Sequence, residues 1–244
     1  MPPGRLALVL GVGPRQGLGA ALARRFAAEG LQVLIAGRSL AKLALVADTI
    51  AEAGGVASPV IADATVETDV QRLFEAATAE GRILEIAAYN VDSNIPAPLL
   101  DTDVDTFTTL WRQNCLGAFL FGREAVKHML PQQRGTLFFT GATGSLRAKP
   151  PFTAFAAAKA GVRALAQGMA REFGPQGIHV VHTVIDGVID GDRARGQFPK
   201  YVAAKGSDGL LQPDAIAETY WQLHRQHPSA WTHEIDLRPF KEPF

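Results

Sequence analysis

Residues 6–26 read LALVLGVGPRQGLGAALARRF, and this stretch decides the fold. The apolar run at 6–11 is typical of a short buried strand, and the alanine-rich segment that begins at Ala20 is typical of a helix. Gly13, Gly17 and Gly19 lie between them. Glycines let the backbone turn sharply and approach a pyrophosphate without Cβ atoms in the way, while the helix N–H groups point at the negative charge. The stretch therefore predicts a strand, a phosphate-binding turn and a helix.

The same alternation of short apolar runs and longer helical patterns continues along the chain. Strands are expected at 6–11, 32–36, 56–62, 83–89, 136–140, 179–185 and 233–237, and helices near 17–29, 39–53, 66–80, 103–130, 153–173 and 213–227. Most of the strands are apolar throughout, as parallel strands covered on both faces are. We expect an α/β protein, a three-layer α/β/α sandwich around a doubly wound sheet of about seven mainly parallel strands.

The chain shows no linker or repeat that would divide it, so residues 1–244 are expected to form a single dinucleotide-binding domain. The stretch at 186–212 contains five glycines and a mixture of charges. We expect it to be a long irregular loop that acts as a substrate lid, because loops of this length in compact domains are usually functional or disordered.

Composition excludes several classes of function. Lysine plus arginine (24) balances aspartate plus glutamate (24), so no overall field favours nucleic acid or an anionic membrane. No apolar run reaches the roughly 18 residues that span a bilayer. The single cysteine, Cys115, excludes an internal disulfide, and the six histidines show no metal-ligand spacing. We expect a cytoplasmic protein with a small-molecule substrate and no metal.

Three features together resemble the short-chain dehydrogenase/reductase family: the Gly-x-x-x-Gly-x-Gly turn, Asn114 in an apolar helix, and Lys159 in the segment FAAAK that begins at Phe155. The resemblance covers roughly residues 5–192 and implies a Rossmann-type fold that binds a nicotinamide dinucleotide. In that family a serine, a tyrosine and a lysine serve hydride transfer, supported by a helix asparagine. The resemblance places Asn114 and Lys159 in the asparagine and lysine positions.

The tyrosine and serine positions depart from the family pattern. Phe155 stands in the tyrosine position and cannot exchange a proton. The serine position falls near Ala142, or at Thr143 if the register is shifted by one residue. Losing a positioned general acid typically removes a factor of about 10²–10⁴ in rate. The motif Tyr-x-x-x-Lys does occur at Tyr201–Lys205, but it lies in the 186–212 stretch, after the sixth strand, where the catalytic helix does not belong.

The end of the second strand indicates which dinucleotide is bound. A site that prefers NAD places a carboxylate there for the ribose 2′-hydroxyl. This chain has Gly37, Arg38 and Ser39 instead, and Arg15 in the glycine turn could approach the same group. Arginine pairs well with a 2′-phosphate, so NADP (NADPH) is the expected cofactor and NAD is less favoured.

The resemblance implies further cofactor contacts. An acidic residue, Asp92, replaces the last glycine of the family's Asn-Asn-Ala-Gly stretch and could reshape the cofactor wall. Including the turn, the expected cofactor-binding residues are Gly13, Arg15, Gln16, Gly17, Leu18, Gly19, Arg38, Ser39, Asp63, Ala64, Asn90, Lys159, Gly187 and Ile189.

Three explanations for the missing phenol stay open. A substitute acid could come from the pocket wall, with Asp186 as the first candidate and Thr143, Ser145, Asp190 and Tyr89 as others. The reaction could need no phenol, as in reduction of an imine or enone. The site could also have lost catalytic activity and still bind dinucleotide.

We expect an NADP(H)-dependent oxidoreductase with a divergent active site that acts on a small, apolar carbonyl, imine or enone. The alternative is a non-catalytic NADP(H) sensor or scaffold. Small residues on the helices at 103–130 and 153–173 favour a homodimer or homotetramer.

Overall fold

The short apolar runs form one parallel sheet in the computed structural model, which describes residues 4–206 and 208–242. The strands are β1 (Arg5–Leu10), β2 (Gln32–Gly37), β3 (Val56–Ile61), β4 (Ile83–Tyr89), β5 (Gly135–Thr140), β6 (Ile178–Ile185) and β7 (Glu234–Leu237). Their order is β3-β2-β1-β4-β5-β6-β7, and every neighbouring pair is parallel. The predicted doubly wound sheet is confirmed, and the strand bounds agree with the sequence patterns to within one residue.

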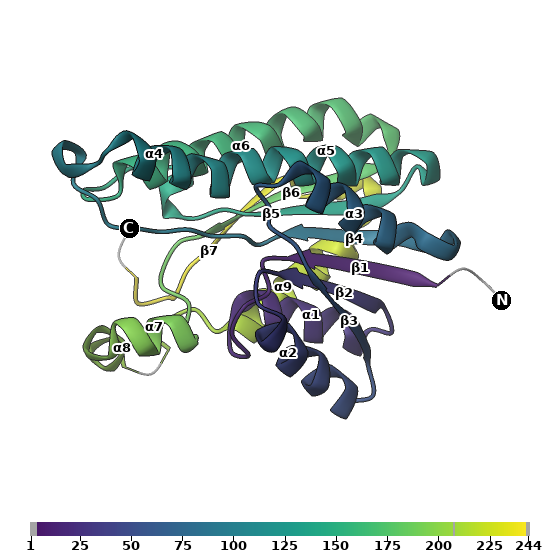
Figure 1. Ribbon diagram of the computed structural model, residues 1–244, viewed down its shortest axis with the longest axis horizontal. Helices are drawn as coiled ribbons and strands as arrows, with labels where there is room; N and C mark the ends of the chain where they lie inside the picture. The colour runs from purple at the N-terminus through teal and green to yellow at the C-terminus, as the bar shows by residue number, and fades with distance from the viewer. Residues whose placement is uncertain (1–3, 207, 243–244) are drawn as a thin grey trace.

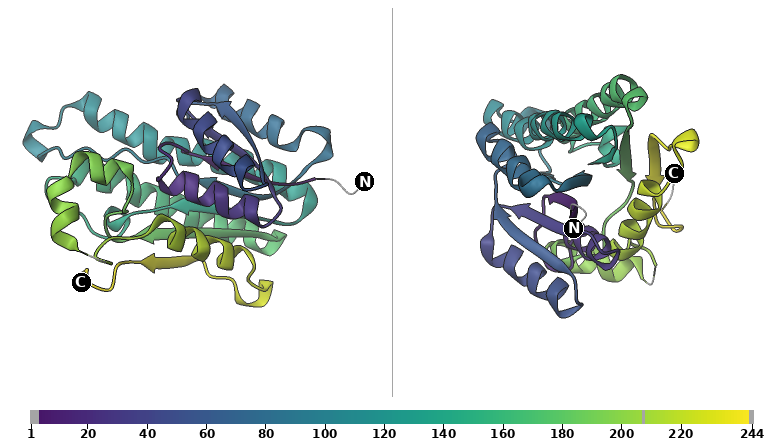
Figure 2. Two further views of the ribbon diagram at one scale, coloured as in Figure 1. Left: turned by 90° about the horizontal axis from the view of Figure 1, so that it is seen from below. Right: turned by 90° about the vertical axis from the view of Figure 1, so that its right-hand side faces the viewer.

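Helices cover both faces of the sheet and make three layers (Figures 1 and 2). One face carries α1 (Leu18–Ala28), α2 (Leu40–Glu52) and α9 (Pro213–His224). The other carries α3 (Glu67–Thr78), α4 (Val104–Trp111), α5 (Gly117–Met129) and α6 (Thr153–Phe173). The described part of the chain contains no helix long and apolar enough to cross a membrane.

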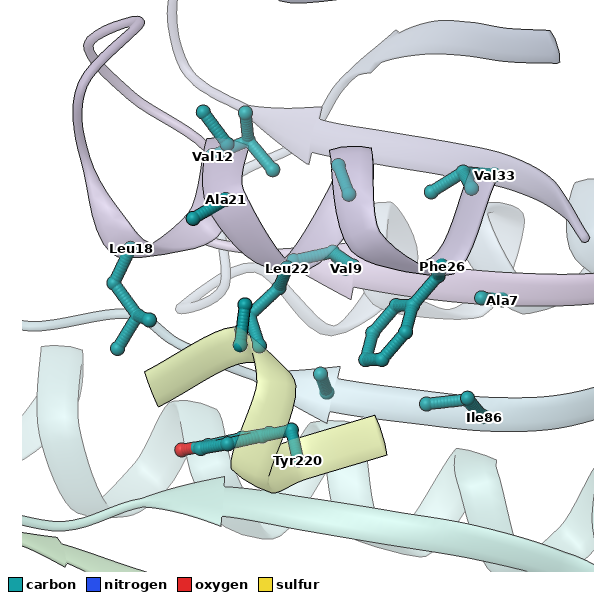
Figure 3. Packing of buried hydrophobic residues seen from close by; sticks show 14 of the residues in the cluster. Ala7, Val9, Val12, Leu18, Ala21, Leu22, Phe26, Val33, Ile86 and Tyr220 are labelled. Carbon is teal, nitrogen blue, oxygen red and sulfur yellow. The ribbon is translucent and has the colours of Figure 1, made fainter. Parts of the chain in front are cut away.

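The core beneath α1 explains why this helix forms where it does. Leu18, Leu22 and Phe26 are spaced four residues apart, so they share one face of the helix and point at the sheet. Figure 3 shows this face opposite the ring of Tyr220 from α9. Phe26 and Tyr220 are fully buried. Burying a side chain of this size stabilises the fold by about 1.5–3 kcal/mol, so α1 holds the turn before it against the sheet.

The expectation of an irregular loop at 186–212 is wrong for much of that stretch. Two short helices, α7 (Asp192–Gln197) and α8 (Pro199–Lys205), lie within it, and Ile189 forms a bridge with Leu211. Proline in the first turn of α8 has no N–H to lose and its backbone is preset for a helix. Both helices lie beside the carboxyl end of the sheet (Figure 1). Position 207 lies outside the described residues.

Two histidines, the buried His182 and the largely buried His224, make the stability of the fold depend on pH. His182 of β6 makes a 2.9 Å hydrogen bond between its Nδ1 and Oε2 of Glu234, and His224 of α9 makes one of 2.9 Å between its Nδ1 and Oγ1 of Thr136. Burial lowers the pKa of each histidine from 6.5 to about 4. Between these values the unfolded chain binds protons that the folded chain does not, so stability falls as pH falls through this window.

We therefore expect the free energy of unfolding to fall by about 2 kcal/mol for each of these two histidines between pH 7 and pH 5. Urea titrations at the two pH values measure this loss. His224→Gln can keep a hydrogen bond to Thr136 and should remove the share of about 2 kcal/mol that His224 contributes. His227→Gln changes an exposed histidine and is the control. An unchanged pH dependence in His224→Gln would contradict the assignment.

Candidate active site

The predicted site residues meet at the carboxyl edge of the sheet. They follow β1, β2, β3, β4, β5 and β6, whose carboxyl ends all lie on this edge because the strands are parallel. The strand order reverses between β1 and β4, and ligands of doubly wound sheets bind in the crevice at such a switch point. The fold therefore brings together segments that are up to about 175 residues apart in the chain.

The turn between β1 and α1 is packed too closely for side chains at two positions. Gly11 has φ +103°, and a Cβ added to it would meet the carbonyl carbon of Asn90 at 2.5 Å. A Cβ on Gly19 would meet the carbonyl oxygen of Gly11 at 2.6 Å, whereas Gly13 faces open space. Gly17 is the N-cap of α1, and no side chain caps the helix there. The amino end of α1 thus keeps N–H groups available beside a bare backbone, which fits a pyrophosphate.

The residues expected to bind a 2′-phosphate also carry the right chemistry. Arg15 and Arg38 are exposed, and neither forms an ion pair with a carboxylate among the residues that the structure describes. Ser39 is the N-cap of α2, and its side chain makes no capping hydrogen bond. A Cβ on Gly37 would meet the carbonyl oxygen of Val12 at 2.5 Å, so no carboxylate side chain fits at that position without a shift of the backbone.

Two polar residues hold the neighbouring strand ends. The Asn90 amide donates to the carbonyl oxygen of Gly11 (3.2 Å) and accepts from the Thr140 hydroxyl (3.1 Å), so it links β1, β4 and β5. After β3, Asp63 accepts 2.8 Å hydrogen bonds from both the backbone N–H and the hydroxyl of Thr65, and the next residue, Ala64, is buried. These contacts shape the wall beside the glycine turn.

Lys159 is a buried cation on α6. Its side chain is 2% exposed, and its Nζ donates to the carbonyl oxygen of Thr140 at 3.1 Å. The same Nζ lies 3.2 Å from Oδ1 of Asp92, which follows β4. Phe155 lies one helical turn earlier, is buried, and has its ring centroid 5.8 Å from Nζ. The lysine and the phenylalanine therefore lie against each other on α6, and Asp92 supplies the negative charge that neither offers.

Asn114 lies in a short π-helical turn, Arg112–Leu116, between α4 and α5. The expected single helix at 103–130 is thus interrupted here, and such turns occur often at functional sites. The Asn114 side chain is fully buried, and its Nδ2 donates to the carbonyl oxygens of Leu110 (2.9 Å) and Ser93 (3.1 Å). Its Oδ1 has no hydrogen-bond partner among the described residues. The residue is positioned in the site and keeps one acceptor for a further group.

Asp186 lies at the end of β6 and is held by positive charge. Its Oδ1 accepts from the Thr143 hydroxyl at 2.6 Å, its Oδ2 lies 2.8 Å from Nη2 of Arg147, and Arg238 forms a further ion pair with it. Burial alone would raise the pKa of the Asp186 carboxyl. The hydrogen bond from Thr143 and the two arginine charges outweigh burial and hold this pKa below its ordinary value.

This arrangement argues against Asp186 as the substitute acid, because a carboxyl whose pKa is lowered has no proton to give at neutral pH. The lowered pKa has a cause that could not be predicted from the sequence. Arg147 and Arg238, from separate segments of the chain, both pair with the Asp186 carboxylate. The Thr143 hydroxyl already donates a hydrogen bond to Asp186, and Ala142 offers no hydroxyl. The expected serine position is therefore not replaced by a free donor.

The other candidate acids are engaged elsewhere. The Tyr89 hydroxyl is buried and donates to the carbonyl oxygen of Gln113 at 2.6 Å, and burial raises its pKa well above the ordinary value. Ser145 is buried and its hydroxyl oxygen accepts from the backbone of Ala142 at 3.1 Å. Asp190 pairs with Arg195, and this hydrogen bond lowers its pKa. Tyr89 and Asp190 are therefore not ready proton donors, whereas the Ser145 hydroxyl accepts and keeps its own proton.

Three remaining sequence expectations concern the segment after β6. Gly187 has φ +157°, and a Cβ on it would meet Pro239 at 2.9 Å, so the C-terminal segment covers it closely. Ile189 packs against the core of the α1 face. Tyr201 lies on α8, where Lys205 pairs with Glu242 at 2.7 Å instead of lining the strand ends. The Tyr201–Lys205 motif thus lies on α8 and not on the helix that carries Lys159.

Sequence reasoning missed the residues that set the charge of the site. Arg147 and Arg238 bind Asp186, but they follow no recognised motif, and Arg238 lies beyond the part of the chain that carries the resemblance. Arg193 of α7 pairs with Asp92 at 3.3 Å. The one available signal was an acidic residue at position 92, where the family pattern has a glycine.

Comparisons with known proteins show the family to which the chain belongs. A family model described as short chain dehydrogenase matches residues 6–205. A short-chain dehydrogenase/reductase of Armillaria gallica is 33% identical over 180 residues, which cover 72% of this chain and 68% of that protein. The crystal structure of a short-chain dehydrogenase from Rhodopseudomonas palustris is 38% identical, with a TM-score of 0.84, and the match covers 98% of this chain and 100% of that one. A gluconate 5-dehydrogenase from Burkholderia cenocepacia, solved with NADP and tartrate, is 23% identical with a TM-score of 0.83 over 97% and 94% of the two chains, and shows the fold alone.

The close packing of the glycine turn can be tested with a matched pair of substitutions. Gly19→Ala should lower the free energy of unfolding by about 1–3 kcal/mol, because its Cβ would overlap the backbone of Gly11. Gly13→Ala should leave stability nearly unchanged, because that position is open. Urea unfolding of both variants gives the comparison. Equal stability of the two would contradict the close approach described here.

Proposed function

This chain belongs to the short-chain dehydrogenase family, and from that premise we propose that it is an NADP(H)-dependent oxidoreductase with a divergent active site. The observation that carries the proposal is the uncapped amino end of α1 behind a turn that excludes Cβ atoms at Gly11 and Gly19. Bare N–H groups at a helix start bind phosphate. A tight turn without a ligand would not require the ends of β1, β2 and β4 to approach so closely.

The phosphorylated cofactor is favoured by charge. Arg15 and Arg38 are exposed without carboxylate partners in the described chain, so each can form a charge-assisted pair with a 2′-phosphate. Gly37 offers no carboxylate to a ribose 2′-hydroxyl. Lys159 and Asn90 would hold the nicotinamide half from the other side of the crevice. When bound, the cofactor supplies the hydride donor or acceptor.

The reaction that suits these residues needs no acid from the protein at the hydride step. The hydroxyls of Thr143 and Tyr89 already donate to protein acceptors, and the Asp186 carboxyl is ionised. Reduction of a carbonyl forms an alkoxide that needs a proton at once. Reduction of an iminium carbon forms a neutral amine, and reduction of an enone forms a delocalised enolate that can take its proton from solvent. We therefore favour a small imine or enone substrate over an unactivated carbonyl.

One observation favours a second candidate function. Phe155 is buried in the tyrosine position and Ala142 stands near the serine position, so both hydroxyls of the family's chemistry are missing. A protein that binds NADP(H) without turnover, as a sensor or scaffold, would tolerate both losses. Sustained oxidation of NADPH with an imine, enone or carbonyl panel would exclude this alternative.

We also propose that the protein is a cytoplasmic homodimer or homotetramer. Val104, Phe107 and Trp111 of α4 are spaced three and four residues apart and are 79%, 44% and 41% exposed. They form an apolar stripe on one helix face, which a second copy of the chain could cover. The particle mass in solution, from light scattering, is the direct check.

The cofactor proposal predicts a change of preference in Arg38→Asp. Each charge-assisted contact is worth about 1.5–3 kcal/mol, so the variant should bind NADPH at least tenfold more weakly and lose little affinity for NADH. Fluorescence titration with both nucleotides measures the two constants. Arg171→Asp removes an exposed arginine at the far end of α6 and is the charge-matched control. If the wild-type protein bound NADH as tightly as NADPH, the proposed cofactor preference would be wrong.

The proposal for the active site predicts a gain of function in Phe155→Tyr. A phenol placed beside Lys159 would restore a proton donor, and positioned acids contribute about 10²–10⁴ in rate. We expect carbonyl reduction with NADPH to rise at least tenfold over the wild type. Phe152→Tyr adds a phenol one turn earlier on the chain and is the control. A Phe155→Tyr variant that binds NADPH and gains no activity would indicate that more than the phenol is missing.

A further inference from the structure

The lid helix α7 spans the crevice between the ends of β1 and β4. The carboxylate Oδ2 of Asp192 accepts a 3.0 Å hydrogen bond from the backbone N–H of Gln16, in the glycine turn after β1. The next residue, Arg193, places Nη1 3.3 Å from Oδ2 of Asp92 and donates from Nη2 to the carbonyl oxygen of Asn94 at 3.2 Å, both after β4. Two adjacent lid residues thus hold the two sides of the switch point.

The two carboxylate oxygens of Asp92 contact different cations, one on α7 and one on α6. Oδ2 faces Arg193, and Oδ1 lies 3.2 Å from Nζ of Lys159. The three side chains form a graded series from solvent to core, since Arg193 is 49% exposed, Asp92 36% and Lys159 2%. A chain of charges therefore runs from the lid surface to the catalytic helix through one aspartate.

The buried lysine needs such a partner. A cation taken out of water costs free energy unless it is paired and hydrogen-bonded. Thr140 contributes only a neutral carbonyl oxygen, and Phe155 contributes a ring face. Among the described residues, Asp92 is the carboxylate that forms an ion pair with Lys159. A glycine at position 92, as in the family pattern, could not make this contact.

We propose that Asp92 is a positioning residue that orients the Lys159 ammonium toward the cofactor site and couples it to closure of the lid through Arg193. The inference rests on the proposed NADP(H) site. Opening α7 removes Arg193 from Asp92 and leaves Lys159 with a less restrained partner. Release of the dinucleotide is then coupled to greater mobility of the Lys159 side chain, and residues 92 and 193 control both.

The coupling predicts a non-additive pair of substitutions in the dissociation rate of NADPH, measured by stopped-flow fluorescence. Arg193→Gln breaks a partly exposed ion pair, so release should be about threefold faster. Asp92→Asn also removes the partner of Lys159 and should speed release about tenfold. The double variant should match Asp92→Asn alone, because Arg193 acts through Asp92. Asp92→Glu keeps the charge and should restore slow release in part.

Arg195→Gln is the matched control, because Arg195 is on the same helix and pairs with Asp190 without reaching Lys159. Its NADPH release should be unchanged. Asp92→Asn should lower thermal stability, because it leaves the buried Lys159 without its carboxylate. Arg193→Gln breaks only a partly exposed pair, so faster release in this variant without loss of stability separates positioning from folding. If the wild type binds no NADPH, the proposed function fails. If it binds and the two substitutions are additive, or Asp92→Asn has no effect on release, this inference is overturned and the proposed function stands.

Discussion

The structure depends on a close approach of backbones at the carboxyl edge, where the turn after β1 passes the ends of β2 and β4. Added Cβ atoms on Gly11, Gly19 and Gly37 would lie 2.5–2.6 Å from neighbouring backbone atoms. Such distances are shorter than van der Waals contact, so the crossing exists only with glycine at these points. Because the turn passes so close to the neighbouring strand ends, two adjacent residues of α7 contact both sides of it: Asp192 accepts from Gln16 after β1, and Arg193 pairs with Asp92 after β4.

Two clusters of charge then divide the site. One links Lys159, Asp92 and Arg193 and connects α6 to α7. The other surrounds Asp186 with arginines and with the hydroxyl of Thr143. Each cluster sets two cations around one carboxylate, so internal ion pairs order the residues at this edge of the sheet.

Much of the fold could be predicted because its signals are local. Strands buried on both faces are apolar throughout, and the helix of α6, Thr153–Phe173, has the bounds expected from its flanking prolines and glycine. The segment with α7 and α8 was missed, since its helices are too short to show a clear apolar period. The interruption at Asn114 was missed as well, because a π-helical turn changes the backbone without changing the apolar pattern.

The sequence by itself determined the doubly wound sheet, the glycine turn and the positions of Lys159 and Phe155, because each is encoded in a short run of residues whose spacing has one physical meaning. Only the tertiary structure decided how charge is distributed in the site. The sequence predicted Asp186 as a proton donor, but the fold places arginines from two other segments beside its carboxylate and lowers its pKa. Ion pairs between distant residues leave no periodic trace in a sequence, since a charge can be satisfied from any element that the fold brings within a few ångströms.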